Sequence, residues 1–568
     1  MRRGLLVAAT AAAALALPAA AWAHAALLRT IPAASVVVNT PPPNVGLVFS
    51  EAVEPRFAIV SVTDVAATQV TAGQPRRSAA NPDELDVPLK HVREGWYLVV
   101  WRVISVDGHP VRGAFTFAIG PNPGPAPQFV IPSLSETAAT PTLVAARWVV
   151  FLSILVALGL LVLRLAIARP LIARVAGTRL RAVSIAFWAA LVVALVATPV
   201  YVLLATAQFA LRSFWSFGAL VPLMRVSAFG RGYLDLELVL ALFAGAAGVA
   251  LWLDRPERER RSVAALLALM GAFLAGGAIL VVPGAAGHAA QTSPRALSLA
   301  LDWLHLTAAA MWIGGLVGLL VLWRSLPAAQ RVAGLLVVVP RFSNVAFVSV
   351  LTLLGSGIWA SILHLPTLAS LWQTSYGQAI IAKASLLLCA MLLAAVNLLR
   401  TKPQLAGATG ASAATWLRRL VGGEAVLVAG AVLAAAVLSS LPPPPKALAG
   451  LGKPSAHTGP GPVTSVVDQN GYRLEFHVTP NRAAAQNTFA VRIAHAGAPV
   501  RGADVVATVT MLDMEMPAQS LQLAESSPGL YERAAPDLVM VGHWGLTFDI
   551  RPRTGAPFTV TLVDRANG

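Results

Sequence analysis

The chain has 568 residues, of which 57% are hydrophobic and only 12% are charged, and its formal net charge is +16. This composition excludes an ordinary soluble globular protein and is typical of a multi-pass membrane protein that also has room for soluble domains. The basic residues lie between apolar segments, which favours a role in orienting the chain in a bilayer over nucleic-acid binding. The single cysteine excludes an internal disulfide and a cysteine-based zinc site.

Residues 1–23 have the features of a secretory signal peptide. Two arginines precede an apolar run, and Ala21-Trp22-Ala23 provides a cleavage site with small residues at its first and third positions. Cleavage after Ala23 would make His24 the first residue, so that its free amine and its imidazole could bind the same metal ion. If cleavage falls elsewhere, His24 is an ordinary exposed residue.

Residues 24–120 are predicted to form a small antiparallel β-sandwich or barrel. Segments 57–63, 96–105 and 114–119 are rich in β-branched and aromatic residues, and turn signals separate them.

The turn between the last two predicted strands, SVDGHPVRG, carries Asp107 and His109. With the two nitrogens of His24, these side chains would provide three nitrogen ligands and one oxygen ligand. A tetragonal set of this kind suits Cu(II). Most Asp-Gly-His turns bind no metal, so an ordinary turn is the alternative interpretation.

The segments HAALLRTIPAASVVVNTPPPNVGLVFSEAVEP and VDGHPVRGAFTFAIG resemble the CopC family of periplasmic copper-binding proteins. The resemblance covers nearly all of residues 24–120 and implies that His24, Asp107 and His109 bind Cu(II). This domain contains no methionine, so the Met-rich Cu(I) site of some members is not expected. His91 matches no motif of the family and is expected on the surface.

A Pro-rich linker at residues 121–143 precedes a transmembrane domain at residues 144–441. Eight apolar segments in this domain are each long enough to cross a bilayer, which takes about 20 residues. They are predicted at residues 144–168, 182–206, 233–253, 263–283, 297–323, 342–364, 378–399 and 421–441.

The loops between these spans predict the orientation of the chain. If residues 24–120 are exported, the cytoplasmic loops contain fifteen arginines and lysines, and the outer loops contain four. This asymmetry follows the positive-inside rule. We therefore expect a multi-pass protein of the bacterial inner membrane whose soluble domains both face the periplasm.

Ionisable side chains within apolar spans cost about 2.5–3.5 kcal/mol each on insertion scales, and so they indicate function. Four such residues, together with His288 at the mouth of the turn before the predicted span 297–323, form a candidate membrane path for copper: His288, Asp302, His305, Lys383 and Glu424. Asp302 and His305 lie three residues apart and share a helix face. A polar pair that only locks helices together is the alternative for these two, and a buried ion pair is the alternative for Lys383 and Glu424.

The predicted helix at residues 297–323 also carries a packing signal. Gly314 and Gly318 form a G-x-x-x-G step, which allows the backbone of another helix to approach closely.

The transmembrane domain resembles the CopD family of inner-membrane copper proteins. The resemblance rests on DWLHLTAAAMWIGGL around His305, GSG at residues 355–357 and SYGQAIIAKASLLL around Lys383, together with Asn397 and Glu424. It extends over the whole transmembrane domain and implies a role in copper uptake and tolerance.

A second linker, rich in proline and glycine, spans residues 442–465, and residues 466–568 are predicted to form another all-β sandwich. Strands are expected at residues 472–478, 488–494, 505–511, 544–550 and 558–563. The segments MLDMEMPAQSLQL, GLYER and GHWGLTFDI resemble YtkA-like domains.

Soft ligands gather in this last domain. Thioethers select Cu(I), and an imidazole can complete such a site. The candidate Cu(I) ligands are Met511, Met514, Met516, Met540 and His543. The alternative is that the methionines fill the core, because their flexible side chains adapt to irregular gaps.

The expected protein is therefore a multi-domain membrane protein with an all-β sandwich, an eight-helix transmembrane bundle and a second all-β sandwich. We expect it to capture Cu(II) and to mediate copper import, homeostasis and tolerance by binding and relay, not by enzymatic catalysis. No nucleotide-binding loop and no D-K-T-G phosphorylation motif occurs. Expected partners are copper ions, the lipid bilayer, and a periplasmic copper chaperone or a cuproenzyme.

Two alternatives belong to other functional classes. The protein could deliver copper to a membrane cuproenzyme without transporting it, or it could be a membrane redox protein that holds haem or copper.

Overall fold

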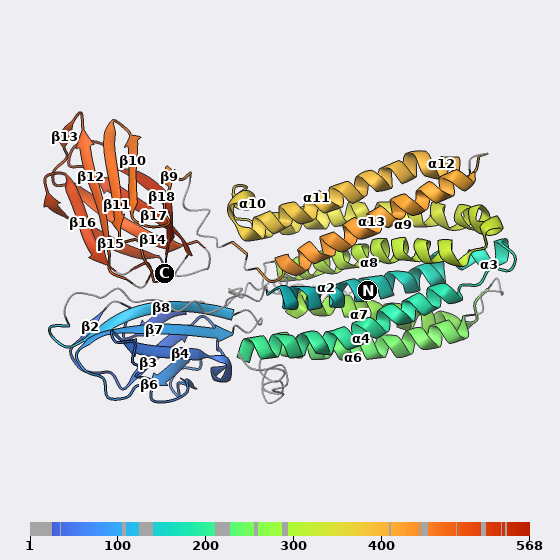
Figure 1. The fold of residues 1–568 in the computed structure, drawn as a ribbon, viewed down its shortest axis with the longest axis horizontal. Coiled ribbons are helices and arrows are strands. Elements are labelled where there is room, and N and C mark those ends of the chain that lie inside the picture. The colour runs from blue at the N-terminus through green and yellow to red at the C-terminus, as the bar shows by residue number, and fades with distance from the viewer. Residues whose placement is uncertain are drawn as a thin grey trace, which may run out of the picture. The chain divides into compact units, whose positions relative to one another are not determined.

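The computed structural model describes most of the chain in three folded regions that follow one another in sequence (Figure 1). The described residues are 25, 27–34, 36–104, 110–123, 140–210, 228–254, 260–286, 294–407, 410–441, 443–444, 453–483, 485–512, 518–535, 537–539 and 542–567. A β-sheet region, a helical region and a second β-sheet region appear in the predicted order, so the predicted fold class is confirmed.

The N-terminal region is a sandwich of two four-stranded sheets. The first sheet has the order β1 (Leu27–Ile31), β3 (Asn44–Phe49), β6 (Glu84–Pro88) and β5 (Arg76–Arg77). The second has the order β2 (Val37–Val38), β8 (Pro110–Ile119), β7 (Gly95–Ile104) and β4 (Ile59–Asp64).

One core lies between these two sheets, because alternate residues of each strand point inward. Leu47 and Phe49 of β3 share it with Val62 of β4, Trp101 of β7 and Phe117 of β8. The rings of Phe49 and Trp101 meet edge to face, with centroids 5.5 Å apart. This contact joins the two sheets.

The helical region contains eight helices among the described residues that are long and apolar enough to span a membrane. Their bounds are α2 Pro141–Val162, α4 Arg181–Ala210, α6 Ala228–Leu253, α7 Val263–Ala286, α8 Arg295–Ser325, α9 Arg331–His364, α11 Ser375–Val396 and α13 Gly410–Leu438. Short helices α3 (Pro170–Arg174), α10 (Ser370–Gln373) and α12 (Lys402–Gln404) lie between them, and π-helical turns at Leu163–Ile167 and Asn397–Thr401 follow α2 and α11.

Two of these helices begin well before the predicted apolar spans. α9 starts at Arg331 and α13 at Gly410, whereas the apolar segments were predicted from residues 342 and 421. The additional turns contain arginines, which the hydropathy pattern assigns to water. A helix does not end where the hydrocarbon ends, because its own hydrogen bonds continue into the polar interface.

Helix α8 packs against α2 on one side and α9 on another, and glycines make both contacts possible. A Cβ at Gly314 would lie 2.5 Å from the Cα of Gly159 in α2, and a Cβ at Gly315 would lie 2.0 Å from the ring of Phe342 in α9. A Cβ at Gly318 would lie 2.8 Å from the Leu163 side chain. The predicted G-x-x-x-G step is therefore confirmed as a close contact, with α2 as the partner.

A cluster of charges joins the segments at the predicted cytoplasmic end. The carboxylate of Asp254, at the end of α6, lies 2.9 Å from Arg164, 3.3 Å from Arg169 and 3.5 Å from Arg261. Asp254 is only 5% exposed, so the ion pairs compensate a carboxylate that burial would otherwise penalise.

The C-terminal region forms a continuous sheet folded over one core. The strand order is β10 (Val463–Gln469), β11 (Tyr472–Thr479), β12 (Asn487–His495), β16 (Leu530–Ala535), β15 (Gln519–Ser527), β14 (Asp504–Met511), β17 (Gly542–Arg551), β18 (Phe558–Ala566) and β9 (Ala456–His457), and β13 (Ala498–Pro499) pairs with β12. Phe476 of β11 and Phe548 of β17 meet in the core with ring centroids 4.7 Å apart.

The contact between α2 and α8 leads to a stability prediction. We expect Gly314→Leu to destabilise the protein by about 3 kcal/mol or more, because overpacking usually costs about 1–3 kcal/mol and here the added atoms meet backbone. The measurement is the thermal unfolding midpoint of the detergent-solubilised protein. Gly271→Leu on α7 is the control, since a Cβ there meets no atom within 4 Å. Equal midpoints for Gly314→Leu and wild type would contradict the contact.

Candidate functional site

The imidazole of His305 joins three transmembrane helices. His305 lies on α8, and its Nδ1 is 2.9 Å from the hydroxyl oxygen of Ser356 on α9. Its Nε2 is 3.2 Å from the Nζ of Lys383 on α11. Both ring nitrogens therefore have a hydrogen-bond partner.

These partners assign the tautomer of His305. The Ser356 hydroxyl donates to the backbone oxygen of Thr352 at 2.5 Å, so its oxygen is left to accept the Nδ1–H of His305. The lone pair of the neutral imidazole then lies on Nε2, where the Lys383 ammonium donates to it. The arrangement holds one metal-binding lone pair in a fixed direction.

Asp302 lies one turn from His305 on the same face of α8, as predicted. Its carboxylate oxygen Oδ2 would be 2.5 Å from a Cβ at Gly284 of α7, so the glycine leaves room for it. Asp302 and Lys383 are also close enough to attract each other electrostatically. The group contains one carboxylate, one ammonium and one neutral imidazole, so it has no net charge. This lowers the free-energy cost of placing the group in the membrane.

His305, Ser356 and Lys383 lie at similar depth. With about 1.5 Å of rise per residue, His305 is roughly 15 Å from the start of α8, and Lys383 is roughly 12 Å from the start of α11. Ser356 is roughly 12 Å from the end of α9 at His364. All three helix ends are on the predicted outer side, and this orientation would place the group within the outer half of the bilayer.

The structure pairs Lys383 and Glu424 with different residues. Glu424 on α13 is 3% exposed and accepts a hydrogen bond from the Asn397 amide at 2.5 Å. Asn397 begins the π-helical turn after α11, roughly 21 Å beyond Lys383 along that chain segment. The predicted alternative of a Lys383–Glu424 ion pair is therefore wrong, and the two residues mark two levels of the bundle.

The remaining candidate of the membrane path, His288, lies outside the described residues, in the segment 287–293 between α7 and α8. His24, Asp107 and His109 of the predicted Cu(II) site also lie outside the described residues. The structure does describe both ends of the segment that carries Asp107 and His109: Ile104 of β7 pairs with Pro110 of β8.

The predicted Cu(I) ligands divide into two groups. Met511 is 2% exposed in the core, which favours the core-filling interpretation for this residue. Met511 pairs with Trp544 of β17. The neighbouring residue His543 is exposed, and its carbonyl accepts a hydrogen bond from the Leu512 amide at 2.8 Å. Met514, Met516 and Met540 lie outside the described residues. They belong to the segments that follow β14 and precede β17, and those two strands are paired at this end.

Within the described parts of the chain, no three histidine, cysteine, aspartate or glutamate side chains lie close enough together to hold a metal ion. The His305 group thus offers one imidazole and one nearby carboxylate.

Comparison with known families divides the chain in the same order as the folded regions. Residues 27–120 match the CopC domain, residues 336–438 match copper resistance protein D (CopD), and residues 467–549 match the YtkA-like family. The chain thus contains CopC, CopD and YtkA-like domains in this order. The CopD match covers α9, α11 and α13, with Ser356, Lys383 and Glu424, but begins after α8, so it does not extend over the whole transmembrane domain.

The chain is similar to individual proteins over nearly its full length or over the CopC domain alone. The chain is 26% identical to the copper transport protein CutJ of Bacillus subtilis over 550 residues, covering 94% of this chain and 95% of CutJ. It is 36% identical to the protein YobA of Escherichia coli over 99 residues, 17% of this chain and 80% of YobA. The crystal structure of CopC from Methylosinus trichosporium OB3b is 32% identical and covers 18% of this chain and 98% of its own, with a TM-score of 0.17.

Two polar groups of this CopC–CopD protein were not predicted from the sequence. Ser356, the acceptor for His305, lies within the GSG segment, but a serine in a helix usually bonds to its own backbone and gives no signal. Arg147 of α2 donates to the Tyr201 hydroxyl on α4, at 2.9 and 2.6 Å, and to Ser439 and Ser440 at 3.1 and 2.7 Å. A charged residue inside an apolar span was the available signal for Arg147.

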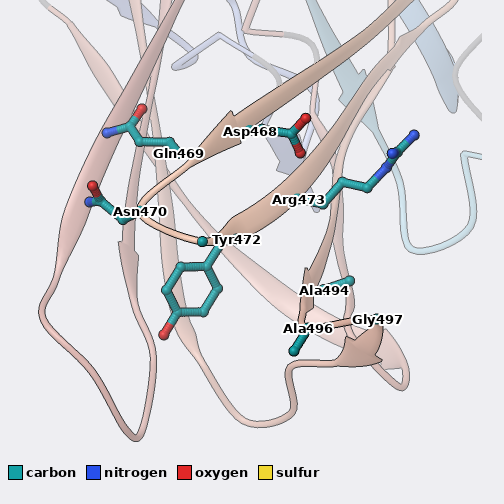
Figure 2. Close-up of a pocket in the computed structure, with 9 residues that line it drawn as sticks. Asp468, Gln469, Asn470, Tyr472, Arg473, Ala494, Ala496 and Gly497 are labelled. Atoms are coloured by element: carbon teal, nitrogen blue, oxygen red, sulfur yellow. The ribbon is translucent and has the colours of Figure 1, made fainter.

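The YtkA-like region has a hollow of about 440 Å³ at the turn between β10 and β11 (Figure 2). Asn470 and Gly471 both have positive φ, 53° and 81°, as a two-residue hairpin turn requires. The Tyr472 ring beside this turn contacts His495, with centroids 4.6 Å apart. None of the nine lining residues that the structure describes carries sulfur or imidazole.

Proposed function

We propose that this protein moves copper across the bacterial inner membrane and that His305 receives the ion within the bilayer. The observation that carries the proposal is the neutral imidazole of His305, whose Nε2 lone pair is held in place by the hydrogen bond from Nδ1 to Ser356. Neutral imidazole is a common copper ligand, and Asp302 supplies a carboxylate one turn away. The similarity to CutJ, a protein named for copper transport, supports copper as the cargo.

The CopC domain is the proposed source of the ion. His24, Asp107 and His109 would capture Cu(II) as three nitrogen ligands and one oxygen ligand. The match to the CopC family supports this assignment. The pairing of Ile104 with Pro110 supports it too, because it brings both ends of segment 105–109 together.

The path continues from His305 toward Glu424. The buried Glu424 carboxylate and the Asn397 amide lie deeper along α11 and α13, and a π-helical turn follows α11 at this level. Such turns occur frequently at functional sites because they interrupt the regular backbone hydrogen bonds. Glu424 is thus the second station of the proposed path.

The YtkA-like domain is the proposed site for Cu(I), through Met514, Met516, Met540 and His543. The soft character of thioethers supports this assignment. Transport in this scheme proceeds by ligand exchange and involves no covalent chemistry, so the protein is not an enzyme. The charge asymmetry of the loops supports a periplasmic position for both soluble domains.

The orientation leads to the first prediction of this proposal. Reporter fusions at Gly407 and Gly459 should report the cytoplasm and the periplasm, respectively, because one predicted span separates them. Alkaline phosphatase activity and fluorescence of a cytoplasmic reporter are the measurements. The same compartment at both positions would reject the orientation.

The role of His305 leads to the second prediction. We expect His305→Ala to lower copper uptake by proteoliposomes at least about 10-fold, since the loss of one ligand bond exceeds about 1.4 kcal/mol. His288→Ala should impair uptake less, because His288 precedes the span. His364→Ala, a histidine at the outer end of α9, is the matched control and should transport normally. Normal uptake by folded His305→Ala protein would show that His305 is structural.

The Cu(II) site leads to the third prediction. One residue added before His24 separates the free amine from the imidazole, and we expect the affinity of residues 24–120 for Cu(II) to fall at least about 10-fold, or 1.4 kcal/mol. Competition with a chelator of known affinity is the measurement. His91→Ala is the control and should bind as the native sequence does. Equal affinities with and without the added residue would reject the role of the amine.

A further inference from the structure

The strongest unexplained feature of the transmembrane domain is the position of Lys383. Its Nζ lies 3.2 Å from Nε2 of His305, and this is the nitrogen that carries the lone pair. The other nitrogen, Nδ1, is committed to Ser356, which is 5% exposed and itself donates to the Thr352 carbonyl. A metal ion therefore has one place to bind on His305, and an ammonium group already occupies it.

A lone pair serves one partner at a time. A copper–nitrogen bond of about 2 Å points along the same direction as the hydrogen bond from Lys383. Copper can bind His305 only after Nζ leaves. The movement needs no shift of a helix, because the lysine head is carried on a flexible four-carbon stem.

Charge also opposes simultaneous occupancy. Asp302 is the carboxylate that interacts electrostatically with Lys383, and its charge balances one cation. Two cations beside one carboxylate would repel each other strongly in a medium of low dielectric constant. The site therefore favours exchange of one cation for the other.

We propose that Lys383 is a tethered competitor of copper at His305, so that the site alternates between a lysine-bound and a copper-bound state. This inference rests on the proposed function and deepens it. When the ammonium returns to Nε2, it lowers the affinity of His305 for copper. A transporter needs this decrease, because an ion that binds too tightly is not released. In the absence of copper, the same ammonium keeps the lone pair closed to other cations.

The test separates affinity from turnover. In proteoliposomes given copper as Cu(II), or as Cu(I) with ascorbate, Lys383→Leu should lower KM about 10-fold, the equivalent of one net hydrogen bond to a charged group. The maximal uptake rate of Lys383→Leu should fall, because no ammonium then competes with copper at His305 and copper is released more slowly. Lys383→Arg keeps a cation and is the matched control, with KM closer to that of wild type. Should Lys383→Leu fail to reach the membrane, Lys383→Gln takes its place, with a smaller decrease of KM expected.

A second measurement, copper binding in detergent, tests the competitor role of Lys383 separately from transport. Copper binding to the full-length protein in detergent is compared by equilibrium dialysis for Lys383→Leu, His305→Ala and the double variant. The increase in affinity caused by Lys383→Leu should disappear in the double variant, which a merely structural role of Lys383 would not produce. An unchanged KM and unchanged affinity in Lys383→Leu would overturn the competitor role even where wild type transports copper. Absence of uptake by wild type would instead reject transport.

Discussion

The backbone contact between Gly159 and Gly314 is the constraint on which the membrane bundle depends. Without side chains at these positions, α2 and α8 approach until a single added Cβ would overlap the opposite backbone. Gly315 leaves room for the Phe342 ring of α9. Because α8 is held from both sides, the face that carries Asp302 and His305 has a fixed direction. The hydrogen bond between His305 and Ser356 of α9 then forms between helices that are already packed, so no further entropy is lost in ordering them.

Three polar groups in the bundle compensate charge in three different ways. At the predicted cytoplasmic end, three arginines surround the Asp254 carboxylate and connect the segments by ion pairs. Near the predicted outer end, the hydrogen-bond partners that the structure describes for Arg147 are hydroxyl groups. The His305 group differs from both, because it combines a neutral ligand atom with an ammonium carried on a flexible four-carbon stem. Stable pairing suits the first two positions, whereas an exchangeable partner suits the proposed role of His305 in ion transport.

The sequence predicts helices and strands, because these depend on local patterns of residues. It does not predict which side chains of different helices meet, because this depends on how the helices are rotated. Hydropathy located all eight spans, and alternating apolar residues located the long central strands such as β7 and β17. Strand β15, with the sequence QSLQLAESS, was missed because most of its residues are polar and exposed. Lys383 and Glu424 were recognised as functional candidates, but opposite charge suggested pairing them. Which residues meet is set by the rotation and depth of α8, α11 and α13, and these are properties of the packed bundle.

Helix α11 has few buried residues among those that the structure describes, since only 6% of its most apolar 18-residue stretch is buried inside the protein. Ile381, Leu388 and Leu392 are among its exposed residues. Lys383, whose Nζ lies 3.2 Å from Nε2 of His305, is thus carried by the helix with the smallest buried share among the eight candidate spans. Because the exposed residues of this helix would meet acyl chains in a membrane, we expect lateral tension and acyl-chain order to affect the position of Lys383. In the proposed transport scheme, copper binding at His305 would by reciprocity change the interaction of α11 with the surrounding bilayer.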